Sequence, residues 1–475
     1  MKIYIMVLNK ALLEKTVEEK FTSYISDLQE LVRIPSISPN KKFNNKEILS
    51  IVEKVTLILS QKGFSVKTYK TKTNPVVVGT LENDPSLPWI TLYNHMDVQP
   101  AESGEWKYED HFNGEVSEGK IWGRGTTDDK GPAMCLLYGI DTLKRIGAKL
   151  PNIQIIYETM EEIGSPGFEN WLKEFGHELK NPHSILVSDT VFEGDYPAIN
   201  YKLKGSLGLD INLKLQEGDL HSGLWSGVAV QPNHIMNKAL NTFCDDSGLI
   251  KVQSILDLMD PISEIELEKQ AEVSKILDLE KLKKDGGNVE LITSNKEIIL
   301  KQRGLMPTFT EHGRQGSQCG LIYEEGKKRE FSFSSTIPNE IRVLGSLRLV
   351  PGLEPQKTLE KVREYFISIH PNFKIEGSKF VHPVNLGFEN AFTKKAFDAY
   401  FDVFKKKPVF TAMGGTIGSI YPFQQYFKGS PIVMAALSLV EDGYHAPNES
   451  FKLDHAKKGI QFIAQYLHSI VEDTN

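Results

Sequence analysis

The glycine-rich segment 119–132, GKIWGRGTTDDKGP, constrains the fold more than any other part of the sequence. Its glycines allow a tight loop, and Pro132 directly after a glycine is typical of the first turn of a helix. The loop also carries two adjacent carboxylates, Asp128 and Asp129. Neighbouring carboxylates repel each other unless a cation lies close to them. The segment therefore predicts a loop-to-helix junction that either binds a metal ion or is a solvated turn capped by Asp128.

Apolar segments on both sides of this loop predict three buried strands, at 88–93, 152–157 and 184–187. Each strand is followed by polar side chains that suit metal chemistry. These side chains are His95 and Asp97 after the first strand, Glu161 and Glu162 after the second, and Asp189 after the third. His95 and Asp97 point the same way in an extended chain, so Asp97 can orient the imidazole. A surface hydrogen bond at a turn is the alternative for so short a motif.

Amphipathic helices are expected at 45–62, before the first of these strands, and at 131–149, between the first and the second. Strands that alternate with helices predict a doubly wound α/β domain with a mainly parallel sheet. Such sheets bind ligands at the carboxyl ends of their strands, where all the polar side chains named above fall. We therefore expect these side chains to form one site.

From about residue 200 the periodicity changes. Residues 207–215 and 341–350 alternate apolar and polar side chains, which predicts strands of a sheet that is buried on one face only. Further helices are expected at 231–243 and 354–369. These segments predict an inserted α+β domain at 200–383 with an antiparallel sheet.

The first pattern then returns in residues 384–475, with a strand at 430–436, a loop that contains His445 and a closing amphipathic helix. Residues 384–475 are therefore predicted to complete the catalytic domain that 1–199 begins. Within the insertion, the highly charged segment 254–284 has helical spacing, and we expect it to be a solvated excursion without chemistry.

Composition excludes several classes of protein. A chain of 475 residues exceeds what one hydrophobic core usually serves, which favours two domains. The net charge of −7 provides no basic stripe for nucleic acid. No apolar run reaches the roughly 18 residues of a membrane-spanning helix. Three scattered cysteines form neither a disulfide framework nor a zinc motif, so we expect a cytoplasmic protein. From the charge and the lack of a long apolar run, we expect no nucleic-acid or membrane partner.

In combination, the motifs resemble those of the dinuclear zinc peptidase family that includes cytosolic nonspecific dipeptidase, carnosinase, glutamate carboxypeptidase and the zinc aminoacylases. The motifs are HMD at 95–97, GRGTTDDKG at 123–131, EE at 161–162, SD at 188–189 and His445, and the resemblance runs from about residue 28 to the C-terminus. It implies two divalent metal ions for each subunit, Zn²⁺ or in its place Mn²⁺ or Co²⁺.

The resemblance also implies a role for each residue of the site. His95 and Asp189 would bind one ion, Glu162 and His445 the other, and Asp128 would bridge both. Glu161 would be the general base, Asp97 would orient His95, and a cis peptide bond would precede Asp129.

Five further residues match the dipeptidase branch of the family. They are His221 as a catalytic group, and Arg348, His382, Thr416 and Ser335 as substrate-binding groups. His221 lies in the insertion, which by resemblance serves as a lid and as the interface of a homodimer in which His221 acts in the partner's site. Arg348 suits a free carboxylate, because a planar guanidinium can bind it with two hydrogen bonds. One departure is the Ala-Met pair at 412–413, where many relatives carry charged residues.

The chemistry of these residues agrees with the resemblance. Imidazole and carboxylate ligands suit zinc, and two adjacent metals can activate a water molecule whose proton Glu161 would take. The leading hypothesis is therefore metal-dependent hydrolysis of dipeptides or short peptides. An N-acyl amino acid deacylase would use the same site and stays open, whereas Glu161 argues against a metal-binding receptor without catalysis.

Overall fold

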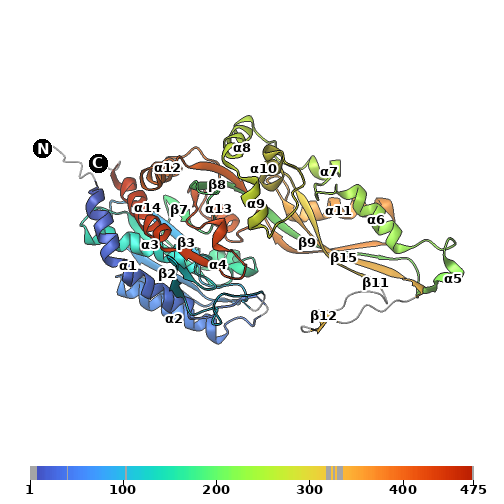
Figure 1. The fold of residues 1–475 in the computed structure, drawn as a ribbon, viewed down its shortest axis with the longest axis horizontal. Helices are drawn as coiled ribbons and strands as arrows, with labels where there is room; N and C mark the ends of the chain where they lie inside the picture. Colours follow the sequence, from blue (N-terminus) through green and yellow to red (C-terminus); the bar gives the residue numbers. More distant parts are fainter. Residues whose placement is uncertain are drawn as a thin grey trace.

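The protein is described from a computed structural model, which covers residues 8–39, 41–101, 104–316, 323–324, 327–328 and 335–472. Two lobes lie end to end in an elongated molecule (Figure 1). The helices at the two ends of the chain, α1 (Lys10–Val32) and α14 (Leu453–Glu472), pack against each other in the first lobe. No helix in the described part of the chain is both long and apolar enough to cross a bilayer.

A nine-stranded sheet forms the centre of the first lobe. Its order is β1 (Ser65–Tyr69), β2 (Val76–Leu81), β6 (Asn152–Glu158), β3 (Trp89–His95), β7 (Ser184–Val187), β19 (Ile432–Ala435), β8 (Ala198–Leu203) and β17 (Val384–Asn385), with β18 (Val409–Met413) also beside β8. The four central strands β6, β3, β7 and β19 are parallel to one another. The predicted α/β class with a mainly parallel sheet is confirmed.

Helices cover both faces of this sheet because its central strands are apolar on both sides. Leu92 of β3 packs into the core beneath α1 and α3, while the next residue, Tyr93, packs into the core on the opposite face. The helices on the Leu92 face are α1, α2 (Lys46–Gln61), α3 (Lys130–Arg145), α12 (Ala391–Phe404) and α14. The helices on the Tyr93 face are α4 (Phe168–Phe175) and α13 (Ile420–Tyr426).

A four-stranded antiparallel sheet forms the second lobe. Its order is β11 (Thr308–Gly316), β15 (Glu340–Leu349), β9 (Gly205–Lys214) and β16 (Phe373–Val381). Alternate residues of β9, such as Leu209 and Ile211, are buried against helices, while Asp210 lies on the open face. The covering helices are α6 (Pro232–Phe243), α7 (Gln253–Leu256) and α11 (Pro355–Ile369).

Shorter elements complete the chain. In the first lobe they are β4 (Glu115–Ser117), β5 (Lys120–Trp122), β20 (Ser450–Lys452) and the 3₁₀ turns η1 (Glu161–Ile163), η2 (Gly176–Glu178) and η3 (Val440–Asp442). In the second lobe they are β10 (Leu220–His221), α5 (Ser222–Trp225), β12 (Tyr323–Glu324), β13 (Lys327–Lys328) and β14 (Thr336–Ile337).

The charged segment 254–284 of the insertion does not have the predicted structure. It forms α8 (Glu264–Ile276) and α9 (Leu279–Asp285), and α10 (Lys296–Leu305) follows. These helices lie at the junction of the lobes, where α8 and α10 pack on β18 (Figure 1). Val273 and Leu277 are buried in the first-lobe core, so the expectation of a solvated excursion is wrong for this segment. The division into 1–199, 200–383 and 384–475 stays a proposal, with α8 to α10 returning from the insertion to the first lobe.

Candidate metal centre

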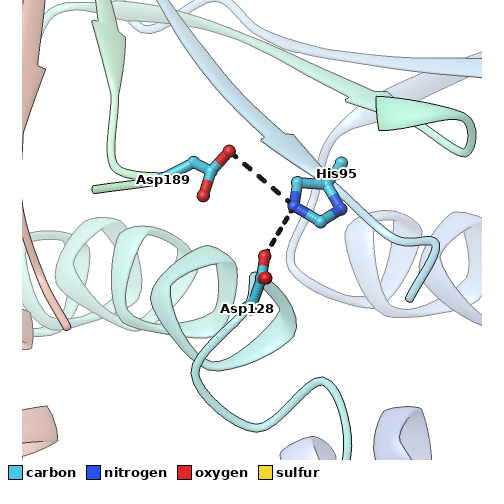
Figure 2. A group of neighbouring side chains, drawn as sticks. All are labelled: His95, Asp128 and Asp189. Carbon is cyan, nitrogen blue, oxygen red and sulfur yellow. Dashed lines mark hydrogen bonds and ion pairs between the residues drawn. The ribbon is translucent and has the colours of Figure 1, made fainter. Parts of the chain in front are cut away.

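The first cluster of candidate ligands gathers at the carboxyl ends of β3 and β7. His95 is the last residue of β3, Asp189 follows β7, and Asp128 lies in the loop before α3. In Figure 2 one ring nitrogen of His95 faces a carboxylate oxygen of each aspartate. His95 Nε2 lies 3.0 Å from Asp128 Oδ1 and 3.8 Å from Asp189 Oδ2. The three side chains are almost fully buried, so the protein itself sets their positions.

A second cluster shares Asp128 with the first. His445 Nε2 lies 3.0 Å from the other carboxylate oxygen of Asp128 and 2.9 Å from Glu162 Oε2. Glu162 comes from η1, which follows β6, and His445 from the loop after η3. The two clusters together contain all five residues that the sequence suggests as metal ligands, with Asp128 between them.

The donor groups of both clusters fit divalent cations. In each cluster, one ligand atom from every residue lies within 4.8 Å of the others. The remaining oxygen of Glu162, Oε1, is buried and has no hydrogen-bond partner among the described residues. Imidazole and carboxylate groups in this arrangement could hold two metal ions, one in each cluster.

The charges of the side chains alone do not balance at this site. Burial and the neighbouring charges of Asp128 and Glu162 raise the pKa of Asp189 to about 7, although His95 opposes the shift. Burial and the charge of Asp189 also raise the pKa of Glu161 well above its usual range. Crowded carboxylates of this kind need positive charge to remain ionised. Bound cations would provide it.

Asp97 has a wider role than the sequence suggests. His95 Nδ1 lies 3.0 Å from the backbone oxygen of Asp97 and 3.5 Å from its carboxylate Oδ1. The two carboxylate oxygens accept hydrogen bonds from the backbone N–H groups of Glu161 and Glu162, each at 3.1 Å, and Ser38 donates another at 2.6 Å. Asp97 therefore ties the end of β3 to η1, which carries the predicted base and one predicted ligand.

Two amide side chains that the sequence analysis did not single out support the ligands. Asn94 Nδ2 donates to Asp129 Oδ2 at 2.7 Å and to Ser188 Oγ at 2.8 Å, which joins three of the segments at the site. Gln99 Nε2 donates to Glu162 Oε2 at 2.8 Å. Both residues lie close to the His95 motif in the sequence, and this is the only feature of the sequence that points to their supporting role.

Glu449 is a fully buried supporting residue to which no pattern in the sequence points. Its Oε1 accepts hydrogen bonds from the backbone N–H groups of Gly125, Thr127 and Asp128 at 2.9, 3.0 and 3.1 Å, and Arg124 donates to Oε2 at 2.8 Å. The Asp128–Asp129 peptide bond in this loop is cis, as the resemblance implies. Glu449 therefore shapes the loop that presents Asp128. The sequence does not predict this role, because one acidic residue four positions after His445 belongs to no recognisable motif.

Comparison with known proteins assigns the family. Residues 91–469 match the profile of Peptidase family M20/M25/M40. The chain belongs to this peptidase family. Cys-Gly metallodipeptidase DUG1 of Candida albicans is 29% identical over 95% of this chain and 96% of its own length. Beta-Ala-His dipeptidase of Homo sapiens is 28% identical over 82% of this chain and 76% of its own length. This M20 peptidase is a metal-dependent hydrolase.

Solved structures share the two-lobed fold. An M20 family metallo-carboxypeptidase from Sulfolobus solfataricus is 26% identical, with a TM-score of 0.80 over 94% of this chain and 99% of that one. Human carnosine dipeptidase 1 is 24% identical, with a TM-score of 0.79 over 98% of this chain and 99% of that one.

Two of the predicted substrate residues of this M20 peptidase meet where the lobes join. Arg348 on β15 donates from Nη1 to Thr416 Oγ1 at 2.9 Å, and Thr416 donates to the backbone oxygen of Lys204 at 2.6 Å. Gly418, in the same loop as Thr416, lies so close to the backbone of Gly164 that a side chain would not fit. Gly164 directly follows η1, so this loop lies against the segment that carries Glu161 and Glu162.

His382 also lies where the second-lobe sheet returns to the first lobe. Its ring stacks on Tyr421 with a centroid distance of 4.0 Å, and its Nδ1 lies 2.8 Å from Glu354 Oε2. The ring is therefore held by neighbours in the protein. Its contact with substrate stays a prediction.

The remaining two predicted residues do not join the cluster. His221 is the N-cap of α5, which lies at the end of the second lobe farthest from the first (Figure 1). Ser335 is exposed, and its backbone oxygen accepts hydrogen bonds from Ser222, next to His221. The structure therefore brings His221 and Ser335 near each other but leaves them apart from the metal ligands of the same chain.

Proposed function

We propose that this M20 peptidase hydrolyses dipeptides with two divalent metal ions and with Glu161 as the general base. The observation that supports the proposal most directly is the pair of ligand clusters that share Asp128. Glu161 lies beside Glu162 but belongs to neither cluster, so its carboxylate is available for proton transfer. Relatives named Cys-Gly metallodipeptidase and Beta-Ala-His dipeptidase support a dipeptide substrate.

His95, Asp128 and Asp189 would hold one ion, and Asp128, Glu162 and His445 would hold the other. Their nitrogen and oxygen donors suit Zn²⁺, with Mn²⁺ and Co²⁺ as substitutes. When bound, two such ions supply Lewis acidity, which polarises the scissile carbonyl and lowers the pKa of water.

The side chains of the protein would supply the proton transfers and hold the substrate. Glu161 would accept a proton from the attacking water and return it to the leaving amine. Arg348 would bind the free carboxylate of the dipeptide with two hydrogen bonds. The described residues offer its guanidinium the hydroxyl of Thr416 and no carboxylate, so its charge is available to a substrate.

A comparison of substrates tests this proposal. We expect metal-loaded protein to release amino acids from Cys-Gly or β-Ala-His faster than from N-acetyl amino acids. A chelator should abolish the activity, and Zn²⁺, Mn²⁺ or Co²⁺ should be tested separately for its recovery. Faster cleavage of the N-acetyl compounds would instead support the deacylase alternative.

We also propose a homodimer built through the second lobe, in which His221 of one subunit serves the metal centre of the other. The tip around α5 exposes several large apolar side chains, with exposed fractions of 72% for Leu224, 72% for Val228 and 60% for Val230. Exposed apolar groups gathered in one place are typical of an interface. The position of α5 at the far end of the lobe also favours action in a partner subunit (Figure 1).

A subunit-mixing experiment tests the homodimer. His221→Ala and Glu161→Gln proteins should each have little activity alone. After subunit exchange, a mixed dimer combines an intact metal centre with an intact His221, so activity should return. If the subunits exchange and the mixture stays inactive, His221 does not act across the interface.

The predicted cytoplasmic location also remains a proposal, which cell fractionation would test.

A further inference from the structure

His445 differs from the other candidate ligands in its exposure. Its side chain is 55% exposed, whereas those of Asp128 and Glu162 in the same cluster are 5% and 2% exposed. Its backbone also has a positive φ of 56°. Because packing on the side chain is limited, the position of His445 depends on how the backbone of its loop is held.

Both ends of this loop are anchored in the first lobe. Glu449 binds the Asp128 loop on one side of His445, as described above. On the other side, Asp442 Oδ2 accepts hydrogen bonds from Leu439 N at 2.8 Å and from Thr127 Oγ1 at 3.2 Å. These contacts come from the same lobe as the other ligands.

A third anchor comes from the insertion. Glu441 on η3, four residues before His445, pairs with Lys452 of β20 and with Lys281 of α9. Lys281 Nζ lies 2.5 Å from Glu441 Oε2. Burial alone would raise the pKa of Glu441, but the two lysines outweigh it and lower the pKa to about 2. Glu441 is therefore held between two cations, one of which reaches it from the inserted stretch.

The helices on either side of α9 are fixed to the first lobe. Glu266 of α8 forms a buried ion pair with Lys202 of β8. At the end of α10, Arg303 Nη2 lies 2.5 Å from Glu193 Oε2, and Glu193 is only four residues after the candidate ligand Asp189. Lys281 therefore extends from a segment that is anchored to the first lobe on both sides of α9, with one anchor near Asp189.

A small cavity of about 260 Å³ lies between α9, the Glu193 turn and η3, lined by Lys281, Leu282, Glu193 and Val440 among others. Side-chain packing is therefore incomplete between α9 and the η3 turn. The ion pair of Lys281 with Glu441 crosses this incompletely packed region and links the two elements directly.

We propose that Lys281 is a positioning residue for the metal centre, which holds Glu441 and through it the loop that presents His445. The inference rests on the proposed two-metal function. In this role α9, a charged helix of the insertion, increases the affinity for the ion that Glu162 and His445 would share. Lys281 itself touches neither substrate nor metal in this role.

Metal titration of three variants tests the proposal. Metal-free Lys281→Ala, Lys281→Arg and Lys283→Ala proteins would be titrated with Zn²⁺ in the presence of a competing chelator. Lys283 is the matched control, because it lies on the same helix and pairs with Glu280 at 2.8 Å within that helix. The side chains of Lys281 and Glu441 are 34% and 28% exposed, and an ion pair that solvent reaches has a modest energy, so for Lys281→Ala we expect the weaker dissociation constant to rise by about two- to fivefold. The tighter constant should stay unchanged, and Lys281→Arg should restore the parent value.

A second comparison separates positioning from a general loss of stability. Lys281→Ala added to Glu441→Gln should weaken metal binding no further than Glu441→Gln alone, because both changes remove the same contact. The unfolding midpoint of metal-free Lys281→Ala should match that of Lys283→Ala. Equal loss of both ions, or an equal effect in Lys283→Ala, would overturn the proposal.

The outcome for the parent protein distinguishes this inference from the proposed function. If the parent binds two ions and cleaves dipeptides while Lys281→Ala binds both ions equally well, the role of Lys281 is wrong and the function stands. If the parent binds no second ion, both are wrong.

Discussion

The two lobes hold their predicted functional residues in different ways. In the first lobe, the candidate ligands come from separate segments of the chain but meet at one edge of a single sheet, and all except His445 are almost fully buried. In the second lobe, the sheet has one open face, and His221 and Ser335 are exposed away from that edge. Arg348 and His382 contact first-lobe residues, Thr416 and Tyr421 respectively.

This difference indicates that the two lobes have different roles. The first lobe presents the candidate metal centre, whose residues its own hydrogen bonds hold in place. The second lobe carries predicted functional groups that lie either where the lobes meet or at the far tip, where they would serve the proposed partner subunit. Changes in the first lobe should therefore affect metal binding and chemistry, whereas changes in the second should affect substrate binding.

The largest effect is expected for Asp128→Ala. Both proposed ions lose a shared ligand and the charge that separates them, so activity should fall to background and the metal content should drop. Metal analysis and dipeptide hydrolysis would measure this. Asp141→Ala is the control, because Asp141 lies on α3, the helix that follows the Asp128 loop, and pairs with Arg145. Two bound ions with normal turnover in Asp128→Ala would contradict the shared-ligand assignment.

Glu161→Gln should separate metal binding from chemistry within the first lobe. Glutamine keeps the shape of the side chain but cannot accept the proton, so we expect turnover to fall on the order of 10²-fold or more with the metal content unchanged. Glu169→Gln, whose side chain pairs with Lys173 on α4, should leave turnover unchanged. If Glu161→Gln loses metal, the roles of Glu161 and Glu162 have been exchanged.

Arg348→Ala tests the contribution of the second lobe. Loss of charged hydrogen bonds to the substrate carboxylate should raise KM by about 10- to 100-fold while metal affinity is retained. Steady-state kinetics with one dipeptide would measure the change. Arg342→Ala is a matched control, because Arg342 lies on the same strand but pairs with Asp210 on the open face. A change in kcat with constant KM would argue against a role in binding the carboxylate.

The smallest effect concerns how the stability of the first lobe depends on pH. His455 lies beside the rings of Phe192 and Phe404, with centroid distances of 4.6 and 5.2 Å. Burial and the nearby lysines 452 and 458 lower its pKa from 6.5 to about 3. The unfolded chain therefore binds more protons than the folded one within this window, so the free energy of unfolding should fall as the pH falls from 6.5 toward 3.

Replacing the ring tests this sign. In His455→Phe, the decrease in unfolding free energy between about pH 7 and pH 5 should be smaller than in the parent by up to about 2 kcal/mol. Urea denaturation at the two pH values would measure it. His312→Gln, an exposed change in the second lobe, should leave the decrease as it is in the parent. The same pH dependence in His455→Phe and the parent would contradict the role of this ring.

The sequence was most informative where a regular pattern of apolar residues is followed directly by residues that can bind metal or transfer protons. Apolar strands followed by His95, Glu161 and Asp189 predicted both the parallel sheet and the edge at which these residues meet. The physical reason is that parallel strands place their carboxyl ends together whatever the length of the connections. Period-two alternation likewise predicted the one-sided sheet of the second lobe. The N-terminal helix α1 was not predicted, although its buried residues, among them Leu13, Val17 and Leu28, recur with helical spacing.

The sequence by itself therefore determined the fold class, the two kinds of sheet and the candidate ligands. Tertiary structure alone decided which distant groups hold those ligands: Glu449 against the Asp128 loop, and Lys281 against Glu441. It also decided that α8 and α10 return to the first lobe and that His221 lies at the far tip. Contacts of this kind join segments that no local periodicity relates, so they depend on how the whole chain packs and leave no pattern in a single sequence.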